Sequence, residues 1–259
     1  MTFKLETVQP TEFLNIITAE RDAFENPPQN IYRLYCPIGN NDRAKAISDI
    51  AEELQEISIK QATTAKSELT TQNTWLKVVQ SSEDPRNELR DEEILAGAEW
   101  IFHKDSETTT TSESMKEDID SLASRQPEGG ARIFAEQAFT ILRTAEAESR
   151  AQVPGSKGYM SLGSFFTAPR HRKKGLGNLL MEWGVERADE MGLDIWIEAV
   201  PSAVPFYERH GFSQLKTVGI DLVCPDGVSE RERLQWEEAS DYILPVTVVL
   251  MYRLAKKDV

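Results

Sequence analysis

The sequence predicts a protein of the α/β class, in the mixed α+β form, with one sheet and flanking helices. Strand-like and helix-like segments alternate along the 259 residues, and no internal repeat is found. Hydrophobic residues make up 40% of the chain, which is enough for an ordinary globular core.

In the first half of the chain, apolar spacing predicts three strands and two helices. The expected strands cover residues 3–8, 75–80 and 94–102, and the expected helices cover residues 11–23 and 41–59. Thr11 is expected to cap the first helix. A charged turn separates the second and third strands, which we expect to pair antiparallel.

A segment rich in Ser, Thr and acidic residues follows, between Lys104 and Gln126. It has too few large apolar residues to build a core of its own. We therefore expect a flexible insertion at about residues 104–130.

The second half continues the alternation. The expected helices cover residues 131–147, 175–191 and 201–209, and the expected strands cover residues 159–167, 194–199, 212–220 and 246–252. Gly192 stands where the second of these helices should end.

Charge and cysteine content narrow the classes of partner. The formal net charge is -14, so we expect neither nucleic acid nor an anionic membrane as a partner. The cysteines Cys36 and Cys224 are not in metal or disulfide spacing, and the histidines show no metal-ligand spacing. No secretion signal or membrane span is recognised, so we expect a cytoplasmic location, with the nucleus as a possible second one.

Residues 170–180, RHRKKGLGNLL, concentrate positive charge between an expected strand and an expected helix. Gly175 and Gly177 allow an anion to approach the unpaired N–H groups at a helix start. Four basic side chains are available to neutralise phosphate: Arg170, Arg172, Lys173 and Lys174. The P-loop and dinucleotide-binding patterns do not match. A solvated surface loop and a nuclear localisation signal remain alternative interpretations.

The loop and a later motif together resemble the GNAT superfamily of acetyl-CoA-dependent N-acetyltransferases. Residues 172–177, RKKGLG, resemble its phosphate loop, and residues 207–212, YERHGF, resemble its late aromatic motif. The strong resemblance covers residues 160–215, and residues 181–193 look like fungal-type members. It implies one domain over residues 1–259, with a mostly antiparallel sheet of six to seven strands. A V-shaped splay in that sheet would bind acyl-CoA.

The resemblance also implies the cofactor site. Pantetheine would pair with the strand before the loop, and the pyrophosphate would bind the loop amides. Val200 stands where many members carry asparagine, and Ser202 is a candidate replacement. The implied cofactor residues are Phe165, Phe166, Thr167, Arg172, Lys173, Lys174, Gly175, Leu176, Gly177, Asn178 and Ser202.

Catalysis in such a protein needs a base, an oxyanion site and an acid. Tyr207 occupies the family's general-acid position, and a core aromatic residue is the alternative interpretation. Glu99 and Glu198 lie on strand-like stretches and are the candidate bases, although strand glutamates more often face solvent. The amide of Phe165 is a candidate oxyanion donor.

The resemblance assigns acceptor selection to residues 24–37 and to a late hairpin at residues 218–245. Tyr32, Tyr35 and Trp236 are candidate lining residues, with core or surface roles as alternatives. An acidic cleft would favour an amine-bearing small molecule or peptide.

The sequence therefore predicts transfer of an acetyl group from acetyl-CoA to a primary amine, by direct attack in a ternary complex and without a metal. A monomer and a homodimer are both compatible with it. A catalytically inactive acyl-CoA sensor or scaffold is the alternative function. A nucleic-acid-binding role for the basic loop is a third reading, which the net charge disfavours.

Overall fold

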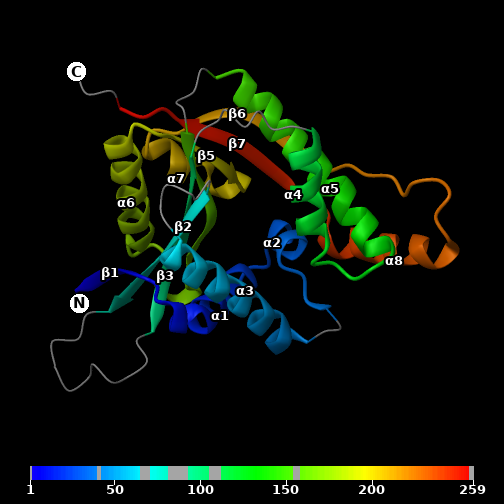
Figure 1. The fold of residues 1–259 in the computed structure, drawn as a ribbon, viewed down its shortest axis with the longest axis horizontal. Helices are drawn as coiled ribbons and strands as arrows, with labels where there is room; N and C mark the ends of the chain where they lie inside the picture. Colours follow the sequence, from blue (N-terminus) through cyan, green and yellow to red (C-terminus); the bar gives the residue numbers. More distant parts are fainter. Residues whose placement is uncertain are drawn as a thin grey trace.

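A seven-stranded sheet with the order β1-β2-β3-β4-β5-β7-β6 is the centre of the computed structural model (Figure 1). The structure describes residues 2–39, 42–64, 71–80, 93–104, 112–153 and 158–256. The strands are β1 Phe3–Thr7, β2 Thr71–Gln80, β3 Ile94–Lys104, β4 Gly158–Thr167, β5 Asp194–Ala199, β6 Ser213–Gly219 and β7 Thr247–Arg253. Neighbouring strands pair antiparallel except β4 and β5, which are parallel. The predicted mixed, mostly antiparallel sheet is confirmed.

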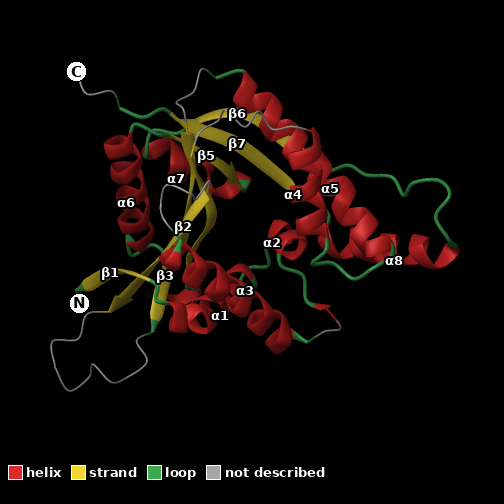
Figure 2. Ribbon diagram, in the orientation of Figure 1, coloured by secondary structure: helices red, strands yellow, loops and turns green. Residues whose placement is uncertain are grey.

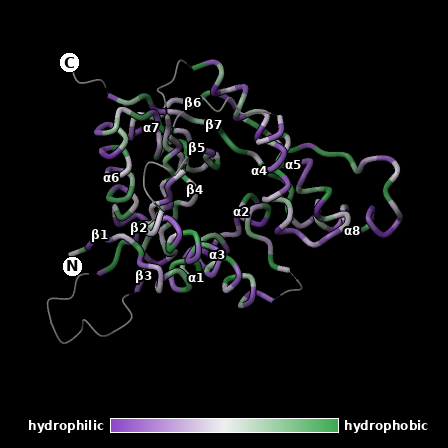
Figure 3. Tube along the Cα trace, viewed as in Figure 1, coloured by the Kyte–Doolittle hydropathy of each residue, from purple (hydrophilic) through white to green (hydrophobic). Residues whose placement is uncertain are grey.

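Figure 2 shows the helices, in red, on the outside of the strands, in yellow. The α-helices are α1 Phe13–Phe24, α2 Asn30–Tyr35, α3 Arg43–Thr63, α4 Ser112–Ala123, α5 Gly130–Ala151, α6 Leu176–Met191, α7 Val204–Arg209 and α8 Glu230–Ile243. The described residues also form the short 3-10 helices η1 Pro10–Glu12, η4 Pro169–His171 and η5 Pro201–Ala203. Hydrophilic and hydrophobic residues alternate along the longer helices (Figure 3), as expected where one side of a helix covers a sheet.

Two positions on β3 show which helix covers which face of the sheet. Gly97 lies against Ile16 of α1, whereas Trp100 lies against Gly184 of α6. Since side chains alternate along a strand, residues 97 and 100 point to opposite faces. The sheet therefore has α1 on one face and α6 on the other.

The sheet splays apart between β4 and β5. The two strands pair only from Tyr159↔Asp194 to Ser161↔Trp196. Beyond these pairs β4 continues beside β3, and β5 continues beside β7. Along β4, Gly163 is skipped in the register with β3, and such a bulge bends a strand. The bend lies at the point where β4 separates from β5.

The expected insertion is in part a regular helix, so that prediction is wrong for residues 112–123. Ile119 and Ala123 of α4 are buried, and they join the core that includes Phe134 and Phe139 of α5. The few apolar residues of the segment lie on one side of α4, which needs α5 as a partner because it has no core of its own. Residues 105–111 lie outside the described part of the chain.

The predicted and observed elements also differ in where one helix begins and in two helices that were not predicted. Thr11 lies inside η1, and α1 begins only at Phe13, so Thr11 does not cap it. The sequence analysis did not foresee α2 or α8, and α8 occupies much of the segment expected to be a late hairpin. Gly192 ends α6 with a φ of 66°, as predicted. In the parts of the chain that can be described, no helix has the length and apolar character needed to cross a membrane.

Candidate active site

The loop between β4 and α6 presents a row of backbone N–H groups. Gly175, the N-cap of α6, has a φ of 82°, and Lys173 has a φ of 61°. Within the residues that the structure describes, the N–H groups of residues 172–177 have no hydrogen-bond acceptor, whereas the N–H of Asn178 bonds to the carbonyl of Gly175. The start of α6 adds the positive end of its helix dipole. This loop can bind an anion.

The basic side chains of the loop divide into two groups. The guanidinium of Arg172 donates to three carbonyl oxygens, those of Thr167 at 3.2 Å, Asn26 at 2.6 Å and Ala23 at 2.8 Å. Arg172 therefore fastens the loop to the end of α1. Lys173 and Lys174 are exposed, and they are the side chains left to neutralise a phosphate.

Arg170 forms an ion pair with Glu93, which also lies 3.2 Å from Nε2 of His171. The Nζ of Lys174 lies 3.1 Å from Nδ1 of the same histidine. These contacts fix the first turn of the loop, η4, beside the start of β3. Arg170 is thus occupied by Glu93 and is not placed as a phosphate ligand.

The strand residues Phe165 and Phe166 point to opposite faces. Phe165 packs against Phe206, with ring centroids 5.6 Å apart, and a Cβ at Gly177 would lie 3.6 Å from the Phe165 ring. Phe166 is buried against Gly97 and Ile16, on the α1 side. Only the side chain of Phe165 therefore lies beside the anion-binding loop.

Three further residues predicted to contact the cofactor have distinct surroundings. Leu176 is buried in the core, so only its backbone is available to a ligand. The Oδ1 of Asn178 lies 3.3 Å from Nε2 of His210. Ser202 is exposed on η5. Their predicted roles with the cofactor stay predictions.

Tyr207 is buried on α7, among aromatic rings. Its ring centroid lies 6.2 Å from that of Phe165, 5.4 Å from Phe206 and 5.7 Å from Phe212. Burial raises the pKa of the Tyr207 phenol above its usual value. The phenol is therefore protonated at neutral pH, as a general acid must be.

Glu99 lies on β3 directly opposite Ser164 of β4, next to the bulge. Its Oε1 accepts a hydrogen bond from Nδ2 of Asn73 at 2.7 Å. A Cβ at Gly163 would clash with Oε2, so the bulge glycine makes room for this carboxylate. Burial raises the pKa of Glu99 to about 7. Such a carboxyl can both gain and lose a proton at neutral pH.

The structure adds a carboxylate that the sequence analysis missed. Glu20 of α1 is only 5% exposed, and it accepts hydrogen bonds from the hydroxyls of Ser164 and, at 3.1 Å, Tyr32. Burial raises its pKa, and its charge in turn raises that of Glu99. The sequence held a signal, since Glu20 continues the apolar spacing of Phe13 and Ile17.

Glu198, the other predicted base, has both oxygens occupied. Nη1 of Arg143 donates to Oε1 at 2.9 Å, and the hydroxyl of Tyr35 donates to Oε2 at 2.9 Å. Burial raises the pKa of Glu198, while Arg143 acts in the opposite direction. Because both of its oxygens already accept hydrogen bonds, Glu198 is better placed to hold Arg143 and Tyr35 in position than to accept a proton.

The aromatic residues predicted to line the acceptor site fall into two groups: two tyrosines that bond to carboxylates, and a tryptophan that does not. Tyr32 bonds to the buried carboxylate of Glu20, and Tyr35 bonds to the half-buried carboxylate of Glu198. Trp236 packs on Phe134, and its Nε1 donates to Gln137 at 2.7 Å. Trp236 therefore belongs to the core beneath α8.

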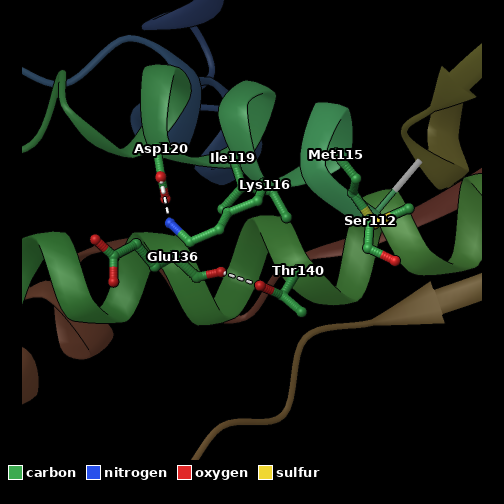
Figure 4. A pocket seen from close by; sticks show the side chains of 7 residues that line it. All are labelled: Ser112, Met115, Lys116, Ile119, Asp120, Glu136 and Thr140. Carbon is green, nitrogen blue, oxygen red and sulfur yellow. Dashed lines mark hydrogen bonds and ion pairs between the residues drawn. The ribbon is translucent and has the colours of Figure 1, made fainter. Parts of the chain in front are cut away.

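A separate hollow of about 430 Å³ lies between α4 and α5, away from the loop (Figure 4). Its lining includes Thr140 and the ion pair of Lys116 with Asp120. Across the described ranges, no group of three or more His, Cys, Asp or Glu side chains is placed to hold a metal ion.

The Acetyltransferase (GNAT) family matches residues 95–212, from the second residue of β3 to the residue before β6. The chain carries a GNAT acetyltransferase domain. This domain contains the splay, the anion-binding loop, Glu99, Glu198 and Tyr207, whereas Glu20 lies outside the matched range.

Relatives of the GNAT domain agree with this assignment. A stretch of 77 residues is 29% identical to the probable acyltransferase SID5 of Ajellomyces capsulatus, which is 30% of this chain and 49% of that protein. The match thus spans about half the length of that relative.

Two solved structures share the fold of the GNAT domain and its flanking helices. Arylalkylamine N-acetyltransferase 2 from Aedes aegypti has a TM-score of 0.59 and 12% identity, with 99% of this chain and all of that chain covered. The polyamine N-acetyltransferase of Drosophila melanogaster has a TM-score of 0.58 and 14% identity, with 97% and 98% covered.

Proposed function

We propose that the protein transfers an acetyl group from acetyl-CoA to a primary amine by direct attack. The observation that carries the proposal is the position of Glu99, a carboxylate with a pKa of about 7, beside the bulge of β4. The anion-binding loop lies at the end of the same strand. One strand thus links a candidate base to a candidate site for the phosphates of coenzyme A.

Two features of β4 and the loop support binding of acyl-CoA. After Ser161, β4 no longer pairs with β5, so its edge is available for a ligand that pairs like a strand, as expected for pantetheine at Phe165 to Thr167. The N–H groups of residues 172–177, with Lys173 and Lys174, then suit the pyrophosphate.

Proton transfers follow from the positions of Glu99 and Tyr207. Glu99 accepts a proton from the acceptor's ammonium group, and the neutral amine attacks the thioester carbonyl. The C–S bond then breaks, Tyr207 donates its proton to the departing sulfur, and the attacking nitrogen loses its second proton, which restores the Tyr207 phenol. The proton that Glu99 accepted passes to solvent. The amide N–H of Phe165 is the proposed donor to the oxyanion. The products are the N-acetylated amine and coenzyme A.

The charges on the α1 side of the sheet favour a cationic acceptor. Glu20 is buried and Glu99 is half-buried beside Ser164, where Arg21 and Arg125 partly offset their charge, and Glu198 is paired with Arg143. The Oε2 of Glu99, which faces the exposed Gly163, is the carboxylate oxygen placed to attract an ammonium group. We propose a small-molecule or peptide amine as the acceptor.

A turnover assay tests the proposal. Release of coenzyme A from acetyl-CoA is measured across a panel of small primary amines and lysine peptides, with the wild type, Glu99→Gln and Glu186→Gln. Glu186 is exposed on α6 and serves as the matched control. We expect Glu99→Gln to lower kcat/KM by about 100-fold or more, as for loss of a general base.

Calorimetry with acetyl-CoA separates binding from turnover. Gly177→Glu would place a carboxylate in the anion-binding loop, and we expect it to abolish binding that the wild type shows. Saturable binding by the wild type without turnover of any amine would contradict the proposal and favour an acyl-CoA sensor. No binding by the wild type would overturn both the proposed acetyl transfer and the acyl-CoA sensor.

A further inference from the structure

Asn73 connects Glu99 to helix α3, which packs beside α1 on the same face of the sheet. Its Nδ2 donates to Oε1 of Glu99 at 2.7 Å, and its backbone N–H donates to Oε1 of Gln61 at 3.2 Å. Gln61 lies in the last turn of α3. Asn73 is thus held by α3 through its backbone and bonds to the candidate base through its side chain, although it lies outside the range matched by the GNAT family.

The hydrogen bond leaves the two oxygens of Glu99 in different situations. Oε1 is occupied by the amide of Asn73, whereas Oε2 faces Gly163 at the bulge of β4. Gly163 is exposed, so the bulge is open to solvent at this point. A proton acceptor is useful only where substrate can reach it, and this condition favours Oε2.

Groups on the elements next to Glu99 favour or oppose ionisation of its carboxyl group. Glu20 of α1 opposes ionisation, and Arg125, which follows α4, favours it. From β2, Trp75 stands opposite Glu99, and its side chain also favours ionisation. From β4, Ser164 donates its hydroxyl to Glu20. Among these neighbours, Asn73 makes the well-defined hydrogen bond to the Glu99 carboxylate, at 2.7 Å to Oε1.

We propose that Asn73 is a positioning residue, whose amide holds Oε1 of Glu99 and so presents Oε2 as the proton acceptor beside Gly163. This inference rests on the proposed function, in which Glu99 is the base. Because an amide cannot ionise, Asn73 supplies the same donor at every pH. Replacing it by a carboxylate of nearly the same shape would remove the donor and add a like charge.

The site has room for such a test. Asn73 and Gln61 line a hollow of about 300 Å³ between α3 and the start of β2. Asn73→Asp preserves the size of the side chain and is expected to fold. Gln72→Glu adds the same charge one residue away, and alternation along β2 points that side chain to the opposite face. Asn73→Ala, which only removes the donor, is the second variant.

The first readout is the pH profile of kcat/KM. We expect Asn73→Asp to move the acidic limb upward by about one pH unit or more, because a like charge replaces a donor beside Glu99. Activity at pH 7 would then fall by about fivefold or more, since the pKa of Glu99 starts at about 7, and it would recover at higher pH. Asn73→Ala should shift the limb in the same direction by a smaller amount, and Gln72→Glu should leave it unchanged.

The second readout does not depend on turnover. The carboxyl 13C resonance of Glu99, assigned by its absence in Glu99→Gln, is titrated in the full-length wild type and in both Asn73 variants. An upward shift of the Glu99 pKa in both variants supports the inference. An unchanged titration in Asn73→Asp and Asn73→Ala overturns it, even if the wild type acetylates amines. Failure of the wild type to acetylate any amine overturns the proposed function instead, and the titration still decides whether Asn73 controls Glu99.

Discussion

The guanidinium of Arg172 lies 2.8 Å from the carbonyl oxygen of Ala23, so the anion-binding loop is tied to the last turn of α1. The same side chain also bonds to the carbonyls of Asn26 and Thr167. A residue with the charge expected of a phosphate ligand thus has its donors directed at the protein itself.

Arg172→Ala should therefore destabilise the fold as well as the loop. We expect a loss of about 1–3 kcal/mol in the free energy of unfolding, because three carbonyls lose a charged donor. Urea unfolding measures this loss. Lys173→Ala is the comparison: it should weaken binding of acetyl-CoA in calorimetry and leave the unfolding free energy within about 0.5 kcal/mol of wild type. Equal stability of the two variants would contradict the structural role of Arg172.

Tyr207→Phe removes the proposed acid while keeping the aromatic ring in its packed position. We expect kcat to fall by roughly 100-fold, which is typical of a lost general acid, with little change in KM for acetyl-CoA. Tyr252→Phe is the matched control, since Tyr252 stacks on Trp196 in another part of the sheet. Steady-state kinetics of the two variants measures the effect, and unchanged kcat in Tyr207→Phe would remove Tyr207 from the mechanism.

Burial of Glu99 should make the protein less stable as the pH rises. Its pKa is raised from 4.5 to about 7, so the folded state holds the proton more tightly than the unfolded chain does. The contribution of this group is therefore fully present below pH 4.5 and is lost as the pH rises through about 7.

Glu99→Gln lacks this titration. Relative to wild type, its free energy of unfolding should increase between pH 4.5 and pH 8 by on the order of 3 kcal/mol, since each pKa unit corresponds to about 1.4 kcal/mol. Urea unfolding at the two pH values tests it, with Glu186→Gln as the control. A constant difference across this range would show that the pKa of Glu99 is not raised.

Gly184 of α6 lies where the helix meets the sheet. A Cβ at this position would clash with the indole of Trp100, whereas a Cβ at Gly219 meets no heavy atom within 4 Å. Gly184→Ala should therefore lower the unfolding free energy by about 1–3 kcal/mol through overpacking. Gly219→Ala should change it by less than about 1 kcal/mol. Thermal unfolding of both variants is the measurement, and equal melting temperatures would contradict the close approach of α6.

Local sequence signals predicted the helices and strands of the GNAT domain apart from α4, where a flexible insertion was expected. The basic glycine loop, the apolar spacing of α6 and the stop at Gly192 lie within one continuous stretch of chain. The splay was different, because it came only from the family resemblance. It depends on where the pairing of β4 and β5 stops, after Ser161 and Trp196, and no local pattern marks that point.

Helix α8 and the buried carboxylate of Glu20 were missed, although the sequence held a signal for each. Ser229 and Glu232 form a capping box at the start of α8. Glu20 interrupts the apolar side of α1 with a carboxylate, which is a pattern that indicates a buried polar contact. Both signals are short, and charged residues surround them, so the general polarity of each segment concealed them.

The choice between Glu99 and Glu198 could not be made from the sequence. Each lies on a strand-like stretch, and the difference comes from distant partners. Arg143 bonds to Glu198 across 55 positions of the chain, and Asn73 bonds to Glu99 across 26. Only tertiary structure shows that a guanidinium and a phenol donate to the two oxygens of Glu198, whereas the neutral amide of Asn73 donates to Glu99.

The short pairing between β4 and β5 also divides the molecule mechanically. Strands β1 to β4 form one continuous hydrogen-bonded group and β5 to β7 form another, with three residue pairs between them. In amide hydrogen exchange, the two groups are expected to open as separate cooperative units, because few hydrogen bonds transmit protection across the gap. A ligand that bonds along the exposed edge of β4 would join these units, so its binding should slow exchange on both sides of the sheet.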